Sequence, residues 1–139
     1  MSIIKVVCGI IFKDHRVLIC RRRPEISLGG YWEFPGGKVE ESESYEESLL
    51  RELIEELNLK VEIKRHFFDT VHHHDKGAIE LISFICSTSD TVVESTDHDQ
   101  LEWVKVSDLL NCHLIPRFNG DMENPRGGVR YVIPSKGSY

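Results

Sequence analysis

The chain has 139 residues, 40% of them hydrophobic and 29% charged, and its formal net charge is −6. This length and apolar content predict one globular domain with an adequate hydrophobic core. The negative net charge disfavours a nucleic-acid-binding surface, and no apolar run approaches the roughly 18 residues that a membrane-spanning helix needs.

The four cysteines lie far apart, and their spacing matches no zinc site. Cys8, Cys20 and Cys86 fall in apolar, strand-like runs, whereas Cys112 lies nearer the end of the chain. We expect buried free thiols. The N-terminus has no basic region before a hydrophobic stretch, so no signal peptide is expected. These features predict a cytoplasmic protein.

The first third of the chain predicts strands. Ile3–Phe12 is enriched in β-branched residues, and Val17–Arg22 forms a second strand after a turn at residues 14–16. A loop is expected at residues 24–30. Trp32–Phe34 is short and extended, and it leads into the Pro-Gly-Gly run at residues 35–37.

The next segment predicts a helix over Tyr45–Leu57. Ser44 is a good N-cap, and Glu47 three residues later completes a capping box. Asn58 suits the left-handed conformation that ends many helices. At 100° per residue, one arc of this helix is apolar and is expected to pack on the core. Its members are Leu49, Leu50, Leu53, Ile54 and Leu57.

The opposite arc of the same helix is acidic. Glu52, Glu55 and Glu56 fall there, flanked by Arg51. Like charges three or four residues apart destabilise an isolated helix by a few tenths of a kcal/mol per pair. Clustered carboxylates suit a hard divalent cation such as Mg²⁺ or Mn²⁺. Charge alone, however, favours a solvated acidic face over a metal site.

The second half of the chain predicts three more strands. Two long strands, Val61–Val71 and Ala78–Ser87, are expected to join around residues 74–77. Glu102–Val106 is another strand, and a short helical turn begins at residues 107–108. Strands and helices thus follow one another in a mixed order that indicates an α/β protein.

The spacing around the acidic helix resembles the Nudix box, G-x5-E-x7-R-E-U-x-E-E-x-G-U, in which U is a bulky aliphatic residue. Gly37, Glu43, the run from Arg51 to Leu53 and the Glu55–Glu56 pair fit it in register. Only the last glycine differs. Asn58 takes its place, a mild departure because that position needs a left-handed backbone.

The resemblance extends beyond the box to MutT-like members of the family. WEFPGGKVE at residues 32–40 is similar to the run that enters their box, as is the opening VVCGIIFKDHRVLICRRRP. LEWVKVSDLL at residues 101–110 resembles a later strand and turn. The similarity covers roughly residues 3 to 110 and implies a Nudix fold, an α/β/α sandwich with a mixed β-sheet.

The resemblance also implies a catalytic set, comprising Arg51, Glu52, Glu55 and Glu56. Glu52 and Glu56 would ligate Mg²⁺, with Mn²⁺ as an alternative, and the carbonyl of Gly37 would lie at the metal. Glu55 would be a further ligand or would orient the attacking water. Arg51 would pair with Glu43 and brace the loop against the helix.

A further acidic ligand is expected from a loop beyond the box. In MutT-like enzymes it often precedes a Trp-Val pair by six residues, and the matching position here is Asp97, before Trp103. Asp97 has a shorter reach than glutamate. Asp99 and Glu94 compete for the role, and all three are about equally well explained as ordinary loop acids.

The activity that the resemblance implies is hydrolysis of a nucleoside triphosphate to the monophosphate and pyrophosphate. The substrate would be CTP or another pyrimidine nucleotide, or an oxidised purine nucleotide. A dinucleoside polyphosphate is an alternative, and so is a non-catalytic nucleotide-sensing Nudix module. The box does not separate these substrates, because it contacts only the diphosphate.

Substrate contacts are expected from basic side chains on either side of the box entrance. Arg22, Arg23 and Lys38 are the candidates, although a solvated basic strand end explains the arginines equally well. Trp32 and Phe34 either stack on a base or pack in the core, and core packing is favoured for Phe34. The partner is thus a small nucleotide, with no nucleic acid or membrane.

We expect two regions in the chain. Residues 1–112 form a Nudix domain, and residues 113–139 form a C-terminal tail that packs on the domain or extends from it. Several prolines and glycines make a long helix there improbable. The tail resembles the segment after the histidine triad of HIT-family nucleotide hydrolases. Asn111 and Leu109 occupy the two earlier triad places, which leaves His113 alone and argues against a HIT active site.

Three interpretations of the tail stay open from sequence. It is a relic of gene fusion, an arm for a homodimer, or a lid that brings arginines near phosphates. The arginines concerned are Arg117, Arg126 and Arg130.

Overall fold

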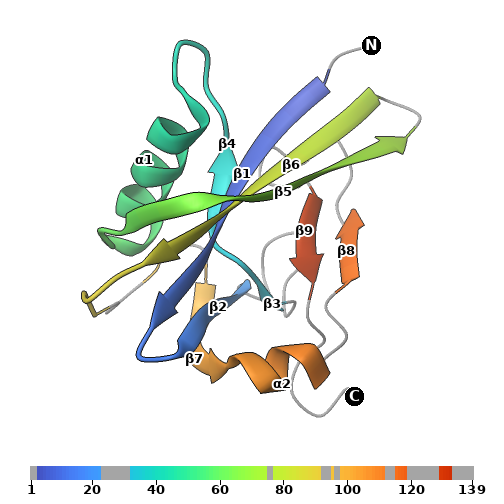
Figure 1. Cartoon of the computed structure of the whole chain (residues 1–139). Coiled ribbons are helices and arrows are strands. Elements are labelled where there is room, and N and C mark those ends of the chain that lie inside the picture. The colour runs from blue at the N-terminus through green and yellow to red at the C-terminus, as the bar shows by residue number, and fades with distance from the viewer. Residues whose placement is uncertain are drawn as a thin grey trace.

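A computed structural model describes residues 3–22, 32–74, 77–91, 95, 98–111, 115–118 and 129–132 (Figure 1). The strands before the first helix are β1 (Ile3–Lys13), β2 (Arg16–Arg22), β3 (Trp32–Glu33) and β4 (Gly36–Lys38). Helix α1 (Tyr45–Leu57) is followed by β5 (Glu62–His74), β6 (Gly77–Ser87), β7 (His98–Lys105) and helix α2 (Val106–Asn111). The last strands are β8 (Ile115–Phe118) and β9 (Val129–Val132).

The main sheet is mixed, which confirms the predicted α/β fold. Its strands follow the order β3-β2-β1-β6-β5, with β4 also paired to β1 and β7 also paired to β2. Strand β1 runs parallel to β6 and antiparallel to β2 and β4. The parallel register joins Ile3 to Ala78 and Phe12 to Ser87, so residues about 75 positions apart in sequence lie side by side.

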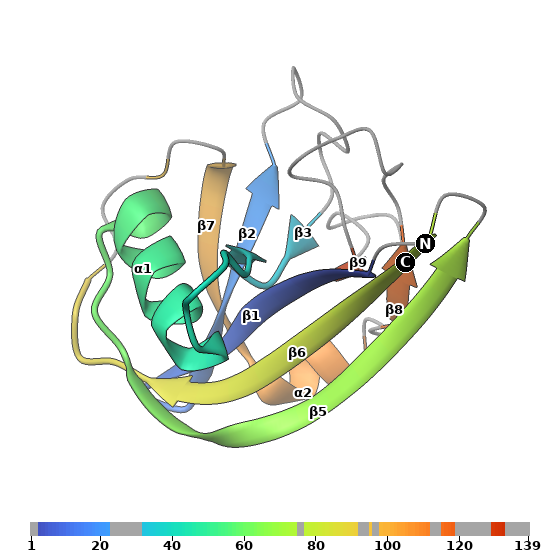
Figure 2. The ribbon, with the colours of Figure 1, turned by 90° about the horizontal axis from the view of Figure 1, so that it is seen from above.

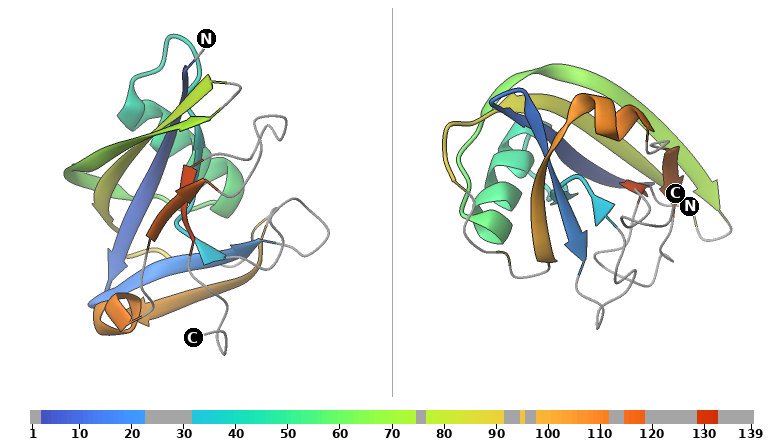
Figure 3. Two further views of the ribbon diagram at one scale, coloured as in Figure 1. Left: turned by 90° about the vertical axis from the view of Figure 1, so that its right-hand side faces the viewer. Right: turned by 90° about the horizontal axis from the view of Figure 1, so that it is seen from below.

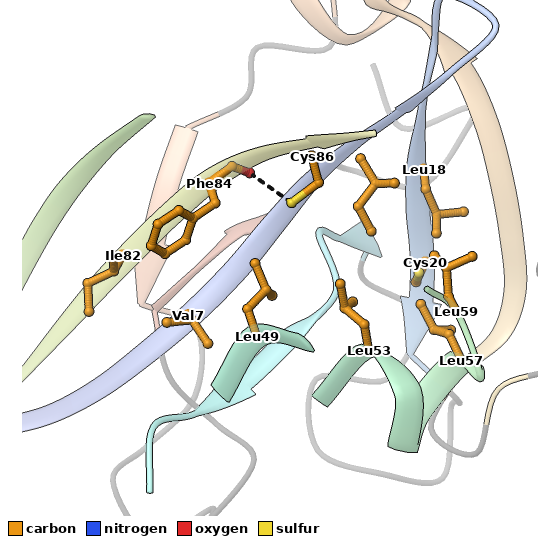
Figure 4. Close-up of a cluster of buried hydrophobic side chains, with 11 residues drawn as sticks. Val7, Leu18, Cys20, Leu49, Leu53, Leu57, Leu59, Ile82, Phe84 and Cys86 are labelled. Carbon is orange, nitrogen blue, oxygen red and sulfur yellow. Dashed lines mark hydrogen bonds between the residues drawn. The ribbon is translucent and has the colours of Figure 1, made fainter. Parts of the chain in front are cut away.

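Helix α1 covers one face of the sheet (Figures 1 and 2). Leu49, Leu53 and Leu57 lie along a stripe of i, i+4 spacing and are at most 1% exposed. They pack into a cluster with strand residues that include Val7 and Ile82 (Figure 4). This stripe leaves Glu55, on the other side of α1, exposed to solvent.

The expectation that Leu50 and Ile54 also pack on the core is wrong. Leu50 is 40% exposed and Ile54 is 41% exposed. Each lies 100° around the helix from its buried neighbour, and the contact between α1 and the sheet is too narrow to cover a second row of side chains.

The other face of the sheet carries a second apolar cluster, which includes Trp32 and Phe34. Phe34 is 4% exposed, which confirms its predicted core position. Strands β8 and β9 form an antiparallel pair, and β9 lies beside β3 and β6. Figures 1 and 3 show this pair on the opposite side of the central strands from α1. The tail therefore contributes strands here instead of a long helix.

Several element ends differ from expectation. β7 begins at His98, four residues before the predicted start, and β5 runs on to His74. Cys8, Cys20 and Cys86 are buried free thiols as predicted, whereas Cys112 lies outside the described residues. In the described ranges, none of the helices has the length and apolar content to span a membrane.

Candidate active site

The acidic helix has well-defined ends. The Ser44 Oγ accepts a hydrogen bond from the Glu47 N–H at 3.1 Å, and the Ser44 N–H donates to Glu47 Oε1 at 2.9 Å. This is the predicted capping box. Asn58 adopts the predicted left-handed conformation, with φ 50° and ψ 40°. Local sequence therefore fixes where the helix begins and ends, and so which carboxylates share its outer face.

Arg51 lies at the centre of the site. Its Nε and Nη2 donate to the two carboxylate oxygens of Glu43 at 2.8 Å and 3.0 Å. Nη2 also donates to the Lys38 carbonyl at 3.3 Å. Arg51 thus ties the end of β4 and the loop after it to the outer face of α1, as the sequence predicted for the Arg51–Glu43 pair.

Ser48 completes this connection, a role that was not predicted from the sequence. Its side chain is fully buried, and its Oγ donates to Glu43 Oε1 at 2.8 Å. The one sequence signal for this hydrogen bond is the position of Ser48 in the turn after the N-cap. A small hydroxyl there can reach back to the preceding loop. Glu43 is therefore held by both Arg51 and Ser48.

These hydrogen bonds fix the charge state of the pair. Hydrogen bonds from Arg51, then from Ser48, hold the pKa of the Glu43 carboxyl below its usual 4.5. In turn, the hydrogen bond to Glu43 and the nearby Glu52 raise the pKa of the Arg51 guanidinium. Both groups are charged at neutral pH.

The same guanidinium reaches the predicted metal ligands. Nη1 of Arg51 lies 3.0 Å from Glu52 Oε1 and 3.2 Å from Glu55 Oε2. Glu52 is only 15% exposed, whereas Glu55 is 58% exposed. With Glu43 and the more distant Glu40, at 3.8 Å, four carboxylates lie within ion-pair distance of Arg51. The site keeps an excess of negative charge.

Strand β4 places a glycine against this cluster. Gly37 pairs with Val7 of β1, and a Cβ on Gly37 would overlap the Glu52 carboxylate. At Gly36 a Cβ would collide with the backbone carbonyl of Val7. Glycine is therefore required at position 36, where it lets β4 approach β1, and glycine at position 37 lets the Glu52 carboxylate stay close to the β4 backbone.

The donor set fits a hard divalent cation. Carboxylate and backbone carbonyl oxygens are the ligands that Mg²⁺ prefers. Among the described residues, no three acidic, histidine or cysteine side chains form a ready-made metal cluster. Mg²⁺ usually keeps several waters and uses one or two protein carboxylates together with substrate phosphates. Glu52 and the partly buried Glu56 of α1 are carboxylates of this kind.

The other predicted site residues are only partly described. Lys38 ends β4 and is exposed. Arg22 ends β2, but its side chain is outside the described part, and Arg23 is outside it altogether. Asp97 and Glu94, two candidates for the loop ligand, also lie outside the described residues.

Comparison with protein families gives one match across most of the chain. The sequence model of the NUDIX domain matches residues 3–124. Among curated proteins, a CTP pyrophosphohydrolase of Escherichia coli K12 is 30% identical over 116 residues, 84% of this chain and 86% of the relative. An 8-oxo-dGTP diphosphatase of Buchnera aphidicola (subspecies Schizaphis graminum) is 34% identical over 122 residues, 83% of this chain and 92% of the relative.

Solved structures show the same fold. The solution structure of the E. coli ORF135 protein superposes with a TM-score of 0.67 at 31% identity, covering 80% of this chain and 79% of that one. A MutT protein from Methanosarcina mazei Go1 superposes with a TM-score of 0.70 at 25% identity, covering 78% and 81%.

Proposed function

The chain belongs to the NUDIX family of hydrolases, and from this premise we propose that it hydrolyses a nucleoside triphosphate in the presence of Mg²⁺. One water is consumed, the anhydride between the α- and β-phosphates breaks, and the products are the nucleoside monophosphate and pyrophosphate. The observation that carries this proposal is the cluster of Glu52 and Glu55 around Arg51, with Gly37 directly against Glu52.

Each residue of the cluster has a role in the proposal. Glu52 and Glu56 would hold the metal with the Gly37 carbonyl, and Glu55 would orient the attacking water or accept its proton. A bound Mg²⁺ would neutralise phosphate charge and lower the pKa of a coordinated water. Arg51 keeps Glu52 and Glu55 in place through hydrogen bonds of 3.0 Å and 3.2 Å.

The substrate class follows from charge and from the relatives. A net charge of −6 suits a polyanionic substrate only when a metal lies between the two. One relative is named for CTP and another for 8-oxo-dGTP. We therefore propose CTP, dCTP and 8-oxo-dGTP as the first substrates to test, with Arg22, Arg23 and Lys38 as candidate contacts to the nucleotide.

The test is release of pyrophosphate from a panel containing CTP, dCTP, 8-oxo-dGTP and diadenosine polyphosphates, with Mg²⁺ or with EDTA. Glu56→Gln should abolish hydrolysis while leaving the thermal unfolding midpoint unchanged. Glu46→Gln is the matched control, because Glu46 is an exposed acid in the first turn of the same helix. Full activity of Glu56→Gln, or of the wild type in EDTA, would contradict the metal–carboxylate mechanism.

A further inference from the structure

The end of α1 is electrostatically unfavourable. Its last turns carry Glu52, Glu55 and Glu56, and the last turn contains no basic residue. The carboxyl end of a helix has a partial negative charge, so acids there repel the helix dipole and one another. An unsupported helix end of this kind frays. The left-handed cap at Asn58 and the buried Leu57 and Leu59 stabilise this end from within, and contacts from elsewhere in the chain add to them.

Those contacts come from the segment after β6. The Thr88 Oγ donates to the Lys60 carbonyl at 2.6 Å, and the Lys60 N–H donates to Asp90 Oδ2 at 3.3 Å. Both backbone polar groups of Lys60, two residues beyond the Asn58 cap, are thus bound by one turn. Figures 1 and 2 show the segment after β6 beside the start of β5. We call Thr88, Asp90 and Lys60 the clamp.

The clamp is itself anchored to the sheet. The Thr88 N–H donates to the Phe12 carbonyl at 3.1 Å, and the Asp90 N–H donates to Thr88 Oγ1 at 3.1 Å. Lys13 Nζ donates to the Asp90 carbonyl at 3.0 Å and lies 5.7 Å from the centre of the Trp103 ring. The position of Asp90 is therefore set by β1 and β7, independently of α1.

We propose that Asp90 and Lys13 are positioning residues, which hold the carboxyl end of α1 so that Glu55 and Glu56 stay aimed at the metal. The inference rests on the proposed function. Lys60 is only four residues beyond Glu56, so a frayed last turn would move the Glu56 backbone directly. Lys13 makes no contact with α1 among the described hydrogen bonds, and so it acts through Asp90.

The test combines Mn²⁺ binding, followed by electron paramagnetic resonance without nucleotide, with amide hydrogen exchange. Asp90→Ala should weaken Mn²⁺ binding about threefold to tenfold, less than the loss of a residue that directly orients a metal ligand. Amides of Leu57 and Leu59 should exchange faster, while the Ser48 amide in the first turn keeps its rate. Asp90→Asn retains a side-chain oxygen acceptor and should restore both properties.

Asp69→Ala is the matched control, because Asp69 is an exposed acid on β5 whose hydrogen-bond partner is His66. A merely structural role for Asp90 predicts faster exchange throughout the chain and an unchanged Mn²⁺ affinity, and that result would overturn the proposal. An Asp90→Ala protein indistinguishable from wild type in both measurements would do the same.

Variants of Lys13 test the same proposal independently. Lys13→Met should loosen the same amides and weaken Mn²⁺ binding, Lys13→Arg should restore both, and Lys13→Met should add little to Asp90→Ala. Additive effects would mean that Lys13 does not act through Asp90. If wild-type protein hydrolyses no nucleotide, the proposed function fails, while exchange at the end of α1 still decides whether the clamp holds the helix.

Discussion

Arg51 binds Glu43 through both of its carboxylate oxygens, at 2.8 Å and 3.0 Å. This two-point contact fixes the plane of the guanidinium, which an ion pair through a single atom would not do. Because the plane is fixed, the remaining nitrogen Nη1 points at Glu52 and Glu55. The pair therefore determines the geometry of the site as well as the stability of the loop.

The first prediction concerns the two-point contact between Arg51 and Glu43. Arg51→Lys keeps the charge but lacks the planar set of donors, so it cannot bind Glu43, Glu52 and the Lys38 carbonyl together. We expect kcat/KM to fall at least about tenfold, as is typical for residues that orient metal ligands, with an unchanged circular dichroism spectrum. Arg16→Lys, at an exposed arginine bound to one carbonyl, should retain activity. A change below twofold in Arg51→Lys would contradict the role.

A second prediction follows from the lowered pKa of Glu43. A carboxyl whose folded pKa is below its unfolded value adds stability above the unfolded pKa, and this is lost as pH falls through the folded pKa. The wild type should therefore lose stability below about pH 4.5, and Glu43→Gln should flatten that part of the profile. Urea unfolding from pH 3 to 6 measures it, with the exposed Glu41→Gln as control. Parallel profiles for wild type and Glu43→Gln would refute the prediction.

Local chemistry made the helix predictable from sequence. The observed bounds of α1, Tyr45–Leu57, match the expected ones because Ser44, Glu47 and Asn58 act within a few residues of each helix end. The Arg51–Glu43 pair was implied by the resemblance to the Nudix box, and the structure shows it joining the loop before α1 to the helix. Interactions of this kind are predictable because the residues that make them lie close together in the sequence.

Features that depend on distant residues were not predictable in this way. Strand β4 contains two glycines in three residues and has little strand propensity of its own. It is a strand because Gly36 allows it to lie against β1, while Gly37 leaves room for the Glu52 side chain of α1. Likewise, periodicity identified the apolar arc of α1 but not its width, which depends on how much of the sheet lies beneath Leu50 and Ile54.

The third prediction tests the close approach of Gly37 to Glu52. In Gly37→Ala the new Cβ would overlap the Glu52 carboxylate, which must move away. We expect loss of Mn²⁺ binding and of activity by about tenfold or more. Gly9→Ala is the matched control on the adjoining β1, because the nearest atoms to its Cβ would be Ile11 Cγ1 at 3.3 Å and Cys86 Sγ at 3.6 Å, neither of which belongs to the acidic cluster. Normal metal binding by Gly37→Ala would show that Glu52 is not positioned by β4.

The fourth prediction compares two leucines of α1. Leu53 is fully buried, so Leu53→Ala should lower the free energy of unfolding by about 2–5 kcal/mol. Leu50 is 40% exposed, so Leu50→Ala should lower the free energy of unfolding by less than about 1 kcal/mol. Urea unfolding at constant m-value measures both. Equal losses would mean that the outer row of apolar residues is also covered in solution.

The last prediction concerns the β8–β9 pair. Strand β9 lies beside β3 and β6, on the face whose cluster contains Trp32, Phe34 and Ile79. These three side chains are at most 4% exposed, and α1 cannot cover them because it lies on the other face. Removing residues 113–139 should therefore expose part of this cluster and lower the free energy of unfolding by about 2 kcal/mol or more, given about 1.5–3 kcal/mol for burying one large apolar side chain.

Removing only residues 133–139 leaves β9 intact and should have little effect on the urea midpoint. The comparison also separates the interpretations that sequence left open for the tail. A fusion relic would be dispensable, so both truncated proteins would unfold like the full chain. If only the longer deletion is destabilising, the tail is part of the domain, and any effect of that deletion on nucleotide hydrolysis must be corrected for stability before Arg117 or Arg130 is assigned a contact with substrate.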